Sequence, residues 1–159
     1  MKNMTAILTI FLGFTLIFSA CEKDSMLIVK SGLNQDFTLV VDQMGIITSF
    51  NSNENRIDTI RMTFKGLVGE DSRCPSNVDC VWSGIAKVEF DIHTKNDDIS
   101  ILLSTIPAPI NPSSNISGVI NSRLDTLGFT FNLIDLSPYP KKNKDINPSK
   151  YKATIKITQ

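Results

Sequence analysis

Residues 86–93 read AKVEFDIH, and apolar and polar side chains alternate throughout the segment. The same period of two runs through residues 59–65 (TIRMTFK) and through residues 151–157 (YKATIKI). Strict alternation puts the apolar side chains on one face of an extended strand and the polar ones on the other, so one face can meet a core while the other meets water. These three segments therefore predict half-buried β-strands.

Four further segments show the alternation more weakly, and no segment after residue 20 has the 3.6-residue apolar period of a helix. They are residues 37–41, 45–48, 99–103 and 127–135. About seven short strands separated by turn-rich segments are typical of an all-β domain. We therefore predict a single antiparallel β-sandwich, immunoglobulin-like, over residues 36–159.

The first twenty residues differ from the rest of the chain. They begin with Lys2, continue with an uncharged apolar run and end in the small residues Ser19 and Ala20, as a cleaved secretory signal does. The run is slightly shorter than the roughly 20 apolar residues that a spanning helix needs. Phe18-Ser19-Ala20-Cys21 resembles the lipobox of bacterial lipoproteins, although Phe18 stands where Leu is usual.

The lipobox resemblance implies that residues 1–20 form a signal helix that is removed. It also implies that Cys21 carries acyl chains, among them palmitate, and that residues 21–35 are a lipidated tether. It places the protein on a bacterial outer membrane, because two or three buried acyl chains together anchor a protein stably. The charged residues 22–24 resemble an export tag for the cell surface, and the periplasmic face is the other option. An ordinary cleaved signal with an unmodified cysteine is the alternative.

The chain has three cysteines, an odd number for an exported protein. If Cys21 carries lipid, Cys74 and Cys80 remain as one pair in an oxidising compartment, so we predict a disulfide between them. The bridge would close a ring of seven residues and stabilise the fold by about 2 kcal/mol through the entropy of the unfolded chain. It would pin the long connection between two paired strands.

Residues 71–84, DSRCPSNVDCVWSG, hold this cysteine pair and the one tryptophan. Rigid scaffolds present recognition side chains on loops, so we interpret the stretch as a candidate binding loop. We expect Trp82 to share the core face of the following strand and to cover the disulfide. The residues named for this loop are Asp71, Arg73, Asn77, Asp79 and Trp82.

Catalysis finds little support in these residues. The one histidine, His93, continues the polar face of its strand, so a serine or cysteine nucleophile has no well-placed base. The spacing Cys-x₅-Cys is not that of a thioredoxin-like motif. Oxygen-bearing side chains at 70–72, 77 and 79 leave calcium open, although their spacing does not match an EF-hand. We predict no enzyme activity and no cofactor, and we assign no metal ligands.

A second long loop, residues 137–150, reads SPYPKKNKDINPSK. Loops of this length in compact domains are often functional. We name Tyr139, Lys141 and Lys142 as a second candidate contact surface, because basic residues beside a tyrosine could touch phosphate or an anionic glycan. The alternative is a solvated lysine-rich turn that protects a sheet edge.

The 71–84 stretch also resembles a known signature. Asp71-Ser72-Arg73-Cys74-Pro75 followed by Cys80, Trp82 and Gly84 is similar to the DSRCP-x₅-C-x-W-x-G signature of uncharacterised bacterial secreted proteins and lipoproteins. Pro138-Tyr139-Pro140 and the later Tyr151 are similar to the end of the same proteins. Ser83 stands where Ala is usual. The resemblance implies a small extracytoplasmic β-rich domain without an assigned activity.

These observations predict a lipid-anchored binding or structural module of the cell envelope, in contact with the membrane through Cys21 and with an envelope protein or glycan. Without Lys2 the charge balance is 15 basic against 16 acidic residues, which provides no general attraction for nucleic acid. One alternative is a secreted inhibitor of a protease or other enzyme that inserts Arg73 into a trypsin-like pocket. A hydrolase is a third possibility.

Overall fold

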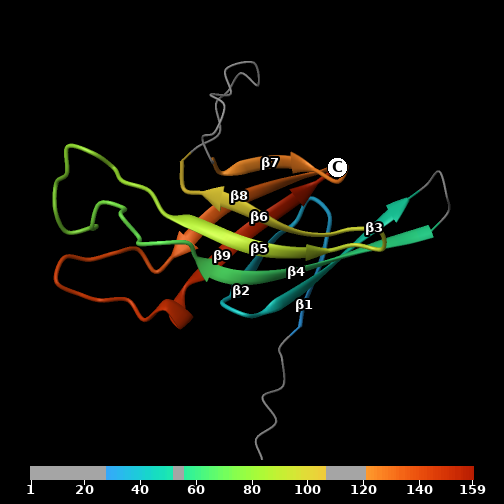
Figure 1. The fold of residues 1–159 in the computed structure, drawn as a ribbon, viewed down its shortest axis with the longest axis horizontal. Helices are drawn as coiled ribbons and strands as arrows, with labels where there is room; N and C mark the ends of the chain where they lie inside the picture. Colours follow the sequence, from blue (N-terminus) through green and yellow to red (C-terminus); the bar gives the residue numbers. More distant parts are fainter. Residues whose placement is uncertain (1–27, 52–55, 107–120) are drawn as a thin grey trace, which may run out of the picture.

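The computed structural model of the protein describes residues 28–51, 56–106 and 121–159, so the predicted signal peptide and Cys21 lie outside the described residues. Strands make up nearly all the regular secondary structure of the described chain (Figure 1). They are β1 (Val29–Gly32), β2 (Asp36–Val40), β3 (Met44–Asn51), β4 (Arg56–Leu67), β5 (Lys87–His93), β6 (Asp98–Ser104), β7 (Arg123–Thr126), β8 (Phe129–Ser137) and β9 (Lys152–Thr158), with one turn of 3₁₀ helix, η2 (Pro148–Lys150), before β9.

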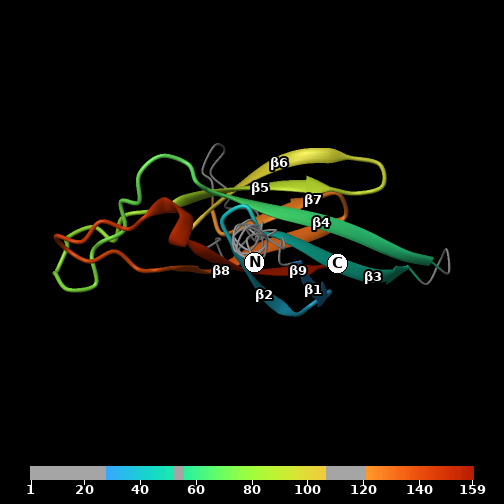
Figure 2. The ribbon, with the colours of Figure 1, turned by 90° about the horizontal axis from the view of Figure 1, so that it is seen from below.

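The strands form two sheets that pack face to face (Figure 2). One sheet has the order β1-β3-β4-β5-β6 and the other has the order β2-β9-β8-β7. The predicted all-β sandwich is confirmed. No helix in the described ranges is both long and apolar enough to cross a membrane.

The strand order is not that of an immunoglobulin domain. An immunoglobulin domain carries strands A, B, E and D in one sheet and C, F and G in the other. Here the chain stays in one sheet from β3 to β6 and in the other from β7 to β9. Within each of these runs, every strand pairs with the strand that follows it in the sequence. The pairing is antiparallel except between β1 and β3, which are parallel.

Two described strands were not predicted, β1 and β7, and both are only four residues long. Four residues are too few for an alternating pattern to stand out from chance. Strand β1 lies inside the segment predicted as a tether (21–35), so that boundary was wrong and the folded domain includes Val29. The pairing of β1 with β3 holds the start of the domain against the five-stranded sheet.

The core lies between the sheets and is made by the alternating segments from which the fold was predicted. Phe64 of β4 and Phe90 of β5 are register partners, with ring centroids 5.1 Å apart and no exposed surface. Burying one such side chain stabilises the fold by about 1.5–3 kcal/mol. The other fully buried members with large side chains are Leu39, Ile47, Ile60, Met62, Ile92, Leu103, Phe131, Leu136, Ile155 and Ile157.

A β-bulge interrupts β8 between Leu133 and Asp135. Because the bulge adds a residue without a register partner, Leu133 and Leu136 are both buried, whereas Ile134 and Asp135 are both exposed. The weak alternation read over 127–135 therefore breaks within β8. The bulge places two outward side chains next to the end of the sandwich where the long loops lie.

Two long connections leave the same end of the sandwich and run side by side (Figures 1 and 2). The first loop, residues 68–86, joins β4 to β5, and the second loop, residues 138–147, joins β8 to η2. Strands β4 and β5 are antiparallel neighbours, as the position of the first loop between two alternating segments predicted. This end of the domain contains all the candidate contact residues named from the sequence.

Candidate functional site

The first loop is closed by a covalent bond and by a short stretch of paired backbone. Cys74 and Cys80 form the predicted disulfide. In addition, the Cys74 backbone amide donates to the Ser83 carbonyl at 2.8 Å, and the Ser72 amide donates to the Ile85 carbonyl at 3.0 Å. The loop is therefore a narrow, tied structure and not an open crossing.

The two sides of the first loop lie close together at Gly84, which has a φ of +66°. A Cβ atom at this position would lie 1.8 Å from the Ser72 carbonyl oxygen, far inside van der Waals contact. Only glycine satisfies both the left-handed backbone and the close approach. The glycine of the DSRCP-type stretch therefore has a structural role.

Arg73 is the centre of the site, and its side chain is 4% exposed. The guanidinium forms a two-pronged ion pair with Asp71, from Nε to Oδ1 at 2.9 Å and from Nη2 to Oδ2 at 2.7 Å. Nη1 donates to the Leu136 carbonyl at the end of β8, and Nη2 also donates to the Pro138 carbonyl at 3.0 Å. One side chain of the first loop thus binds the backbone on both sides of Ser137, the last residue of β8.

Asp71 accepts a further hydrogen bond from the Tyr151 hydroxyl at 2.9 Å. Burial raises the pKa of Asp71, but hydrogen bonds from Arg73 and Tyr151 and the charge of Arg73 outweigh it and hold that pKa below its ordinary value. Burial, followed by the hydrogen bond to Asp71 and its charge, raises the pKa of Tyr151 to about 12. We call Asp71, Arg73 and Tyr151 the arginine cluster.

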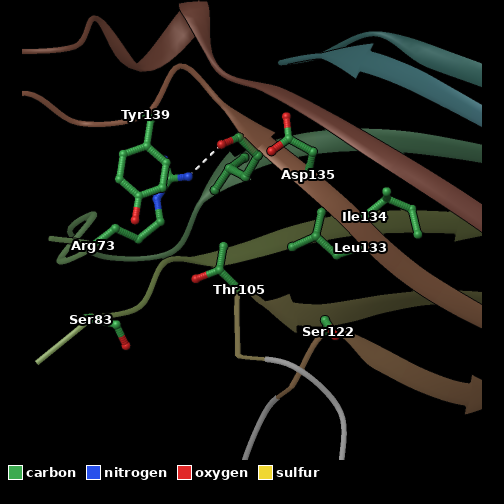
Figure 3. Close-up of a pocket in the computed structure, with 10 residues that line it drawn as sticks. Arg73, Ser83, Thr105, Ser122, Leu133, Ile134, Asp135 and Tyr139 are labelled. Carbon is green, nitrogen blue, oxygen red and sulfur yellow. Dashed lines mark hydrogen bonds between the residues drawn. The ribbon is translucent and has the colours of Figure 1, made fainter. Parts of the chain in front are cut away.

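The two loops also meet beyond the arginine cluster. The Ser76 amide donates to the Pro140 carbonyl at 2.9 Å, and the Lys142 amide donates to Asn77 Oδ1 at 2.8 Å. The Tyr139 ring lies over the Arg73 guanidinium (Figure 3), and the distance from the ring centroid to Cζ is 4.7 Å. The two contact surfaces predicted separately are therefore one surface.

The structure changes the role of three residues named from the sequence. The side chains of Asp71 and Arg73 are 6% and 4% exposed, so they hold the loops together and do not present themselves to a partner. Trp82 is 72% exposed and is not a lid on the disulfide. The reason is that β5 begins only at Lys87, so Trp82 is not held on the core face of that strand.

The remaining named residues lie on the joined surface. Asp79 is exposed, and so is Asn77, whose side chain binds the second loop. Tyr139 is 48% exposed, and Lys141 and Lys142 of the second loop are exposed. These exposed residues are Asn77, Asp79, Trp82, Tyr139, Lys141 and Lys142.

A groove of about 500 Å³ lies beside the arginine cluster, and sequence reasoning did not find it. Its walls come from the first loop, from the bulge of β8 and from the residues on either side of 107–120 (Figure 3). Residues from segments so far apart in the chain leave no common local pattern. The groove is lined by Arg73, Ser83, Gly84, Thr105, Ser122, Leu133, Ile134, Asp135, Leu136 and Tyr139.

The described residues show no group of three or more His, Cys, Asp and Glu that could hold a metal ion. The Asp71 carboxylate, named among the oxygens of a calcium alternative, is bound by Arg73 and Tyr151. His93 lies at the end of β5 away from the first loop and contacts Asp98 at 2.9 Å. The site is thus equipped with an aromatic surface, a groove and hydrogen-bonding groups.

Comparisons with protein-family models, curated proteins and solved structures gave no match for this chain.

Proposed function

We propose that this protein is a binding module of the bacterial cell envelope that recognises its partner with the end of the sandwich formed by the two joined loops. The observation behind this proposal is the exposure of Val81 and Trp82: Val81 is fully exposed and Trp82 is 72% exposed. Two adjacent apolar side chains in water on a loop that is otherwise tied down are typical of a recognition surface.

The rigidity of the first loop supports this function. Val81 and Trp82 follow the disulfide residue Cys80 directly, and the next residue, Ser83, accepts the hydrogen bond from the Cys74 amide. A loop fixed before binding loses little conformational entropy on binding, so more of the contact free energy appears as affinity. Tryptophan is also enriched among the residues that dominate binding energy at interfaces.

The location rests on the N-terminal segment and on the cysteines. Phe18-Ser19-Ala20-Cys21 resembles a lipobox, and pairing of Cys74 with Cys80 leaves Cys21 as the cysteine available for lipid. A disulfide is also typical of compartments outside the cytoplasm. We propose that the lipid on Cys21 anchors the module to the outer membrane and that the module has no catalytic activity.

The geometry disfavours the inhibitor alternative in the form that we considered. Insertion of Arg73 into a trypsin-like pocket requires its guanidinium in solvent, whereas four hydrogen bonds to Asp71, Leu136 and Pro138 keep it inside the domain. Releasing it would leave the Asp71 carboxylate without its counter-ion. Among the described residues, no arrangement favours the hydrolase alternative.

Site-specific photocrosslinking in cells tests the proposal. A photoreactive phenylalanine derivative replaces Trp82, and the matched control replaces Phe50, which is 64% exposed and lies in β3. We expect a discrete adduct of higher mass from position 82 and none from position 50. The absence of adducts at 82, or the same adducts from both positions, would contradict recognition by the joined loops.

A further inference from the structure

We infer that the groove beside the arginine cluster is a binding site for a neutral carbohydrate, one or two sugar rings of a glycan. The inference rests on the proposed function, since it names a ligand class for the same end of the domain. It is carried by three features of the groove: hydrogen-bonding groups that the fold leaves unused, an aromatic ring at the rim, and an apolar wall.

Arg73 lines the groove but does not make it an anion site. Its guanidinium donates to the Asp71 carboxylate and to the Leu136 and Pro138 carbonyls, and its side chain is 4% exposed. The Asp71 carboxylate balances its positive charge, so this wall of the groove offers no free cation to a ligand.

The unused hydrogen-bond acceptor of the groove is the Asp135 carboxylate. Asp135 is exposed and lines the groove, and its carboxylate has no hydrogen-bonding or ionic partner among the described residues. The bulge of β8 puts it there, beside Ile134. A lone carboxylate in the groove accepts hydrogen bonds and disfavours a second negative charge, which argues against phosphate, sulfate or uronic acid as the ligand.

Hydroxyl groups complete the polar wall. Thr105 Oγ1 accepts from the Ala86 amide at 3.1 Å, which leaves its own hydrogen to be donated. Ser83 is exposed on the first loop and lines the opposite part of the groove. A sugar hydroxyl both donates and accepts, so it can bind a carboxylate and a protein hydroxyl at once.

The apolar part of the groove matches the other face of a sugar. The Tyr139 ring is fixed by its contact with Arg73 and remains 48% exposed, so it offers a rigid platform at the rim (Figure 3). Ile134 is 50% exposed and lies on the same wall as Asp135. The C–H faces of a pyranose ring pack on such surfaces. A volume of about 500 Å³ is in the range of small-ligand sites.

The test is calorimetric titration of the full protein, extracted from membranes in the sugar-free detergent lauryldimethylamine oxide. The probes are cellohexaose, laminarihexaose, xylohexaose, maltohexaose and chitohexaose, with hexagalacturonate and a sulfated carrageenan hexamer as anionic arms. The variants are Asp135→Asn and Tyr139→Ala, and the matched control is Asp97→Asn in the turn between β5 and β6. Equal urea midpoints for all proteins show that the fold is intact.

We expect at least one neutral oligosaccharide to bind, with affinity about tenfold weaker or more for Asp135→Asn and for Tyr139→Ala and unchanged for Asp97→Asn. Binding of no neutral probe, stronger binding of the anionic probes, or equal affinity for Asp135→Asn and the parent would overturn the inference. If crosslinking at position 82 succeeds and titration fails, the binding module stands and the carbohydrate site does not. If both fail, the proposed function fails with it.

Discussion

The Tyr151 hydroxyl lies 2.9 Å from Asp71 Oδ2, although the two residues are 80 positions apart in the chain. Tyr151 directly precedes β9, and Asp71 lies in the first loop. The same carboxylate holds Arg73, which reaches the backbone at Leu136 and Pro138. One buried cluster therefore ties the first loop to both ends of the β8–β9 connection, and the exposed tip of the loop depends on it.

Asp71→Asn should destabilise the protein by about 3 kcal/mol or more, because it leaves the Arg73 charge buried without a counter-ion. The matched control is Asp125→Asn, since Arg123 and Asp125 form a pair with the same spacing of two residues but with side chains 50% and 63% exposed. The control should lose less than about 1 kcal/mol. Urea unfolding at neutral pH measures both, and equal losses would contradict a structural role for the arginine cluster.

The effect of Asp71→Asn should depend on pH. The folded protein holds the pKa of Asp71 below its ordinary value of 3.8, so the ionised carboxylate stabilises the fold above that value. This contribution is lost as the pH falls through the lower, folded pKa. The difference in unfolding free energy between the parent and Asp71→Asn should therefore shrink below about pH 4, which a series of unfolding curves from pH 6 to pH 2.5 would measure.

Tyr151 should ionise far above an ordinary tyrosine. The chain has two tyrosines, so Tyr139→Phe leaves Tyr151 as the one phenol and its absorbance at 295 nm reports on it alone. We expect a midpoint of about 12 in the folded variant and near 10.0 in the denatured one. Because the folded pKa is the higher one, this residue's stabilisation is complete below pH 10 and is lost as the pH rises toward 12. Coincident titrations of folded and denatured protein would refute the buried hydrogen bond.

Gly84→Ala should cost more stability than the strain of placing alanine in a left-handed backbone conformation would by itself. Gly128→Ala is the matched control, because Gly128 has a φ of +75° and nothing within 4 Å of the added Cβ. The control should lose about 1–2 kcal/mol from the backbone conformation. Gly84→Ala adds the clash with the Ser72 carbonyl oxygen and should lose on the order of 3 kcal/mol or more. A smaller loss at position 84 than at 128 would show that the two sides of the loop do not meet there.

Cys21→Ser should abolish incorporation of radiolabelled palmitate, because the lipid would have no thiol to attach to. The control is the double variant Cys74→Ser with Cys80→Ser, which removes the disulfide and should keep the label. Gel fluorography of immunoprecipitated protein measures the incorporation. Label retained by Cys21→Ser would refute the lipoprotein assignment.

The alternating segments could be read directly because alternation is a local consequence of a strand with one face on a core. Residues 59–65, 86–93 and 151–157 lie in or next to strands, with their apolar side chains buried. The disulfide followed from counting cysteines. The four-residue strands β1 and β7 could not be found in this way, since their pairing partners and not their own sequences hold them extended.

The sequence identified some of the residues that make the site, but some of the roles predicted for them were wrong. Arg73 and Trp82 looked like contact residues and a lid, but Arg73 is buried and Trp82 is exposed. Burial of a charged residue depends on whether a counter-ion and several carbonyls are within reach, and the carbonyls of Leu136 and Pro138 come from segments 63 and 65 residues away. The bulge that turns Asp135 outward likewise depends on the register with β9.

The sequence by itself determined that the described chain is an all-β sandwich with a stapled loop between two paired strands, because period-two patterning and cysteine pairing are local properties. Tertiary structure alone decided that the two loops form one surface, that Asp71, Arg73 and Tyr151 meet, and that a groove opens beside them. Those features require segments distant in the chain to be brought within hydrogen-bonding distance, and only packing of the two sheets does that.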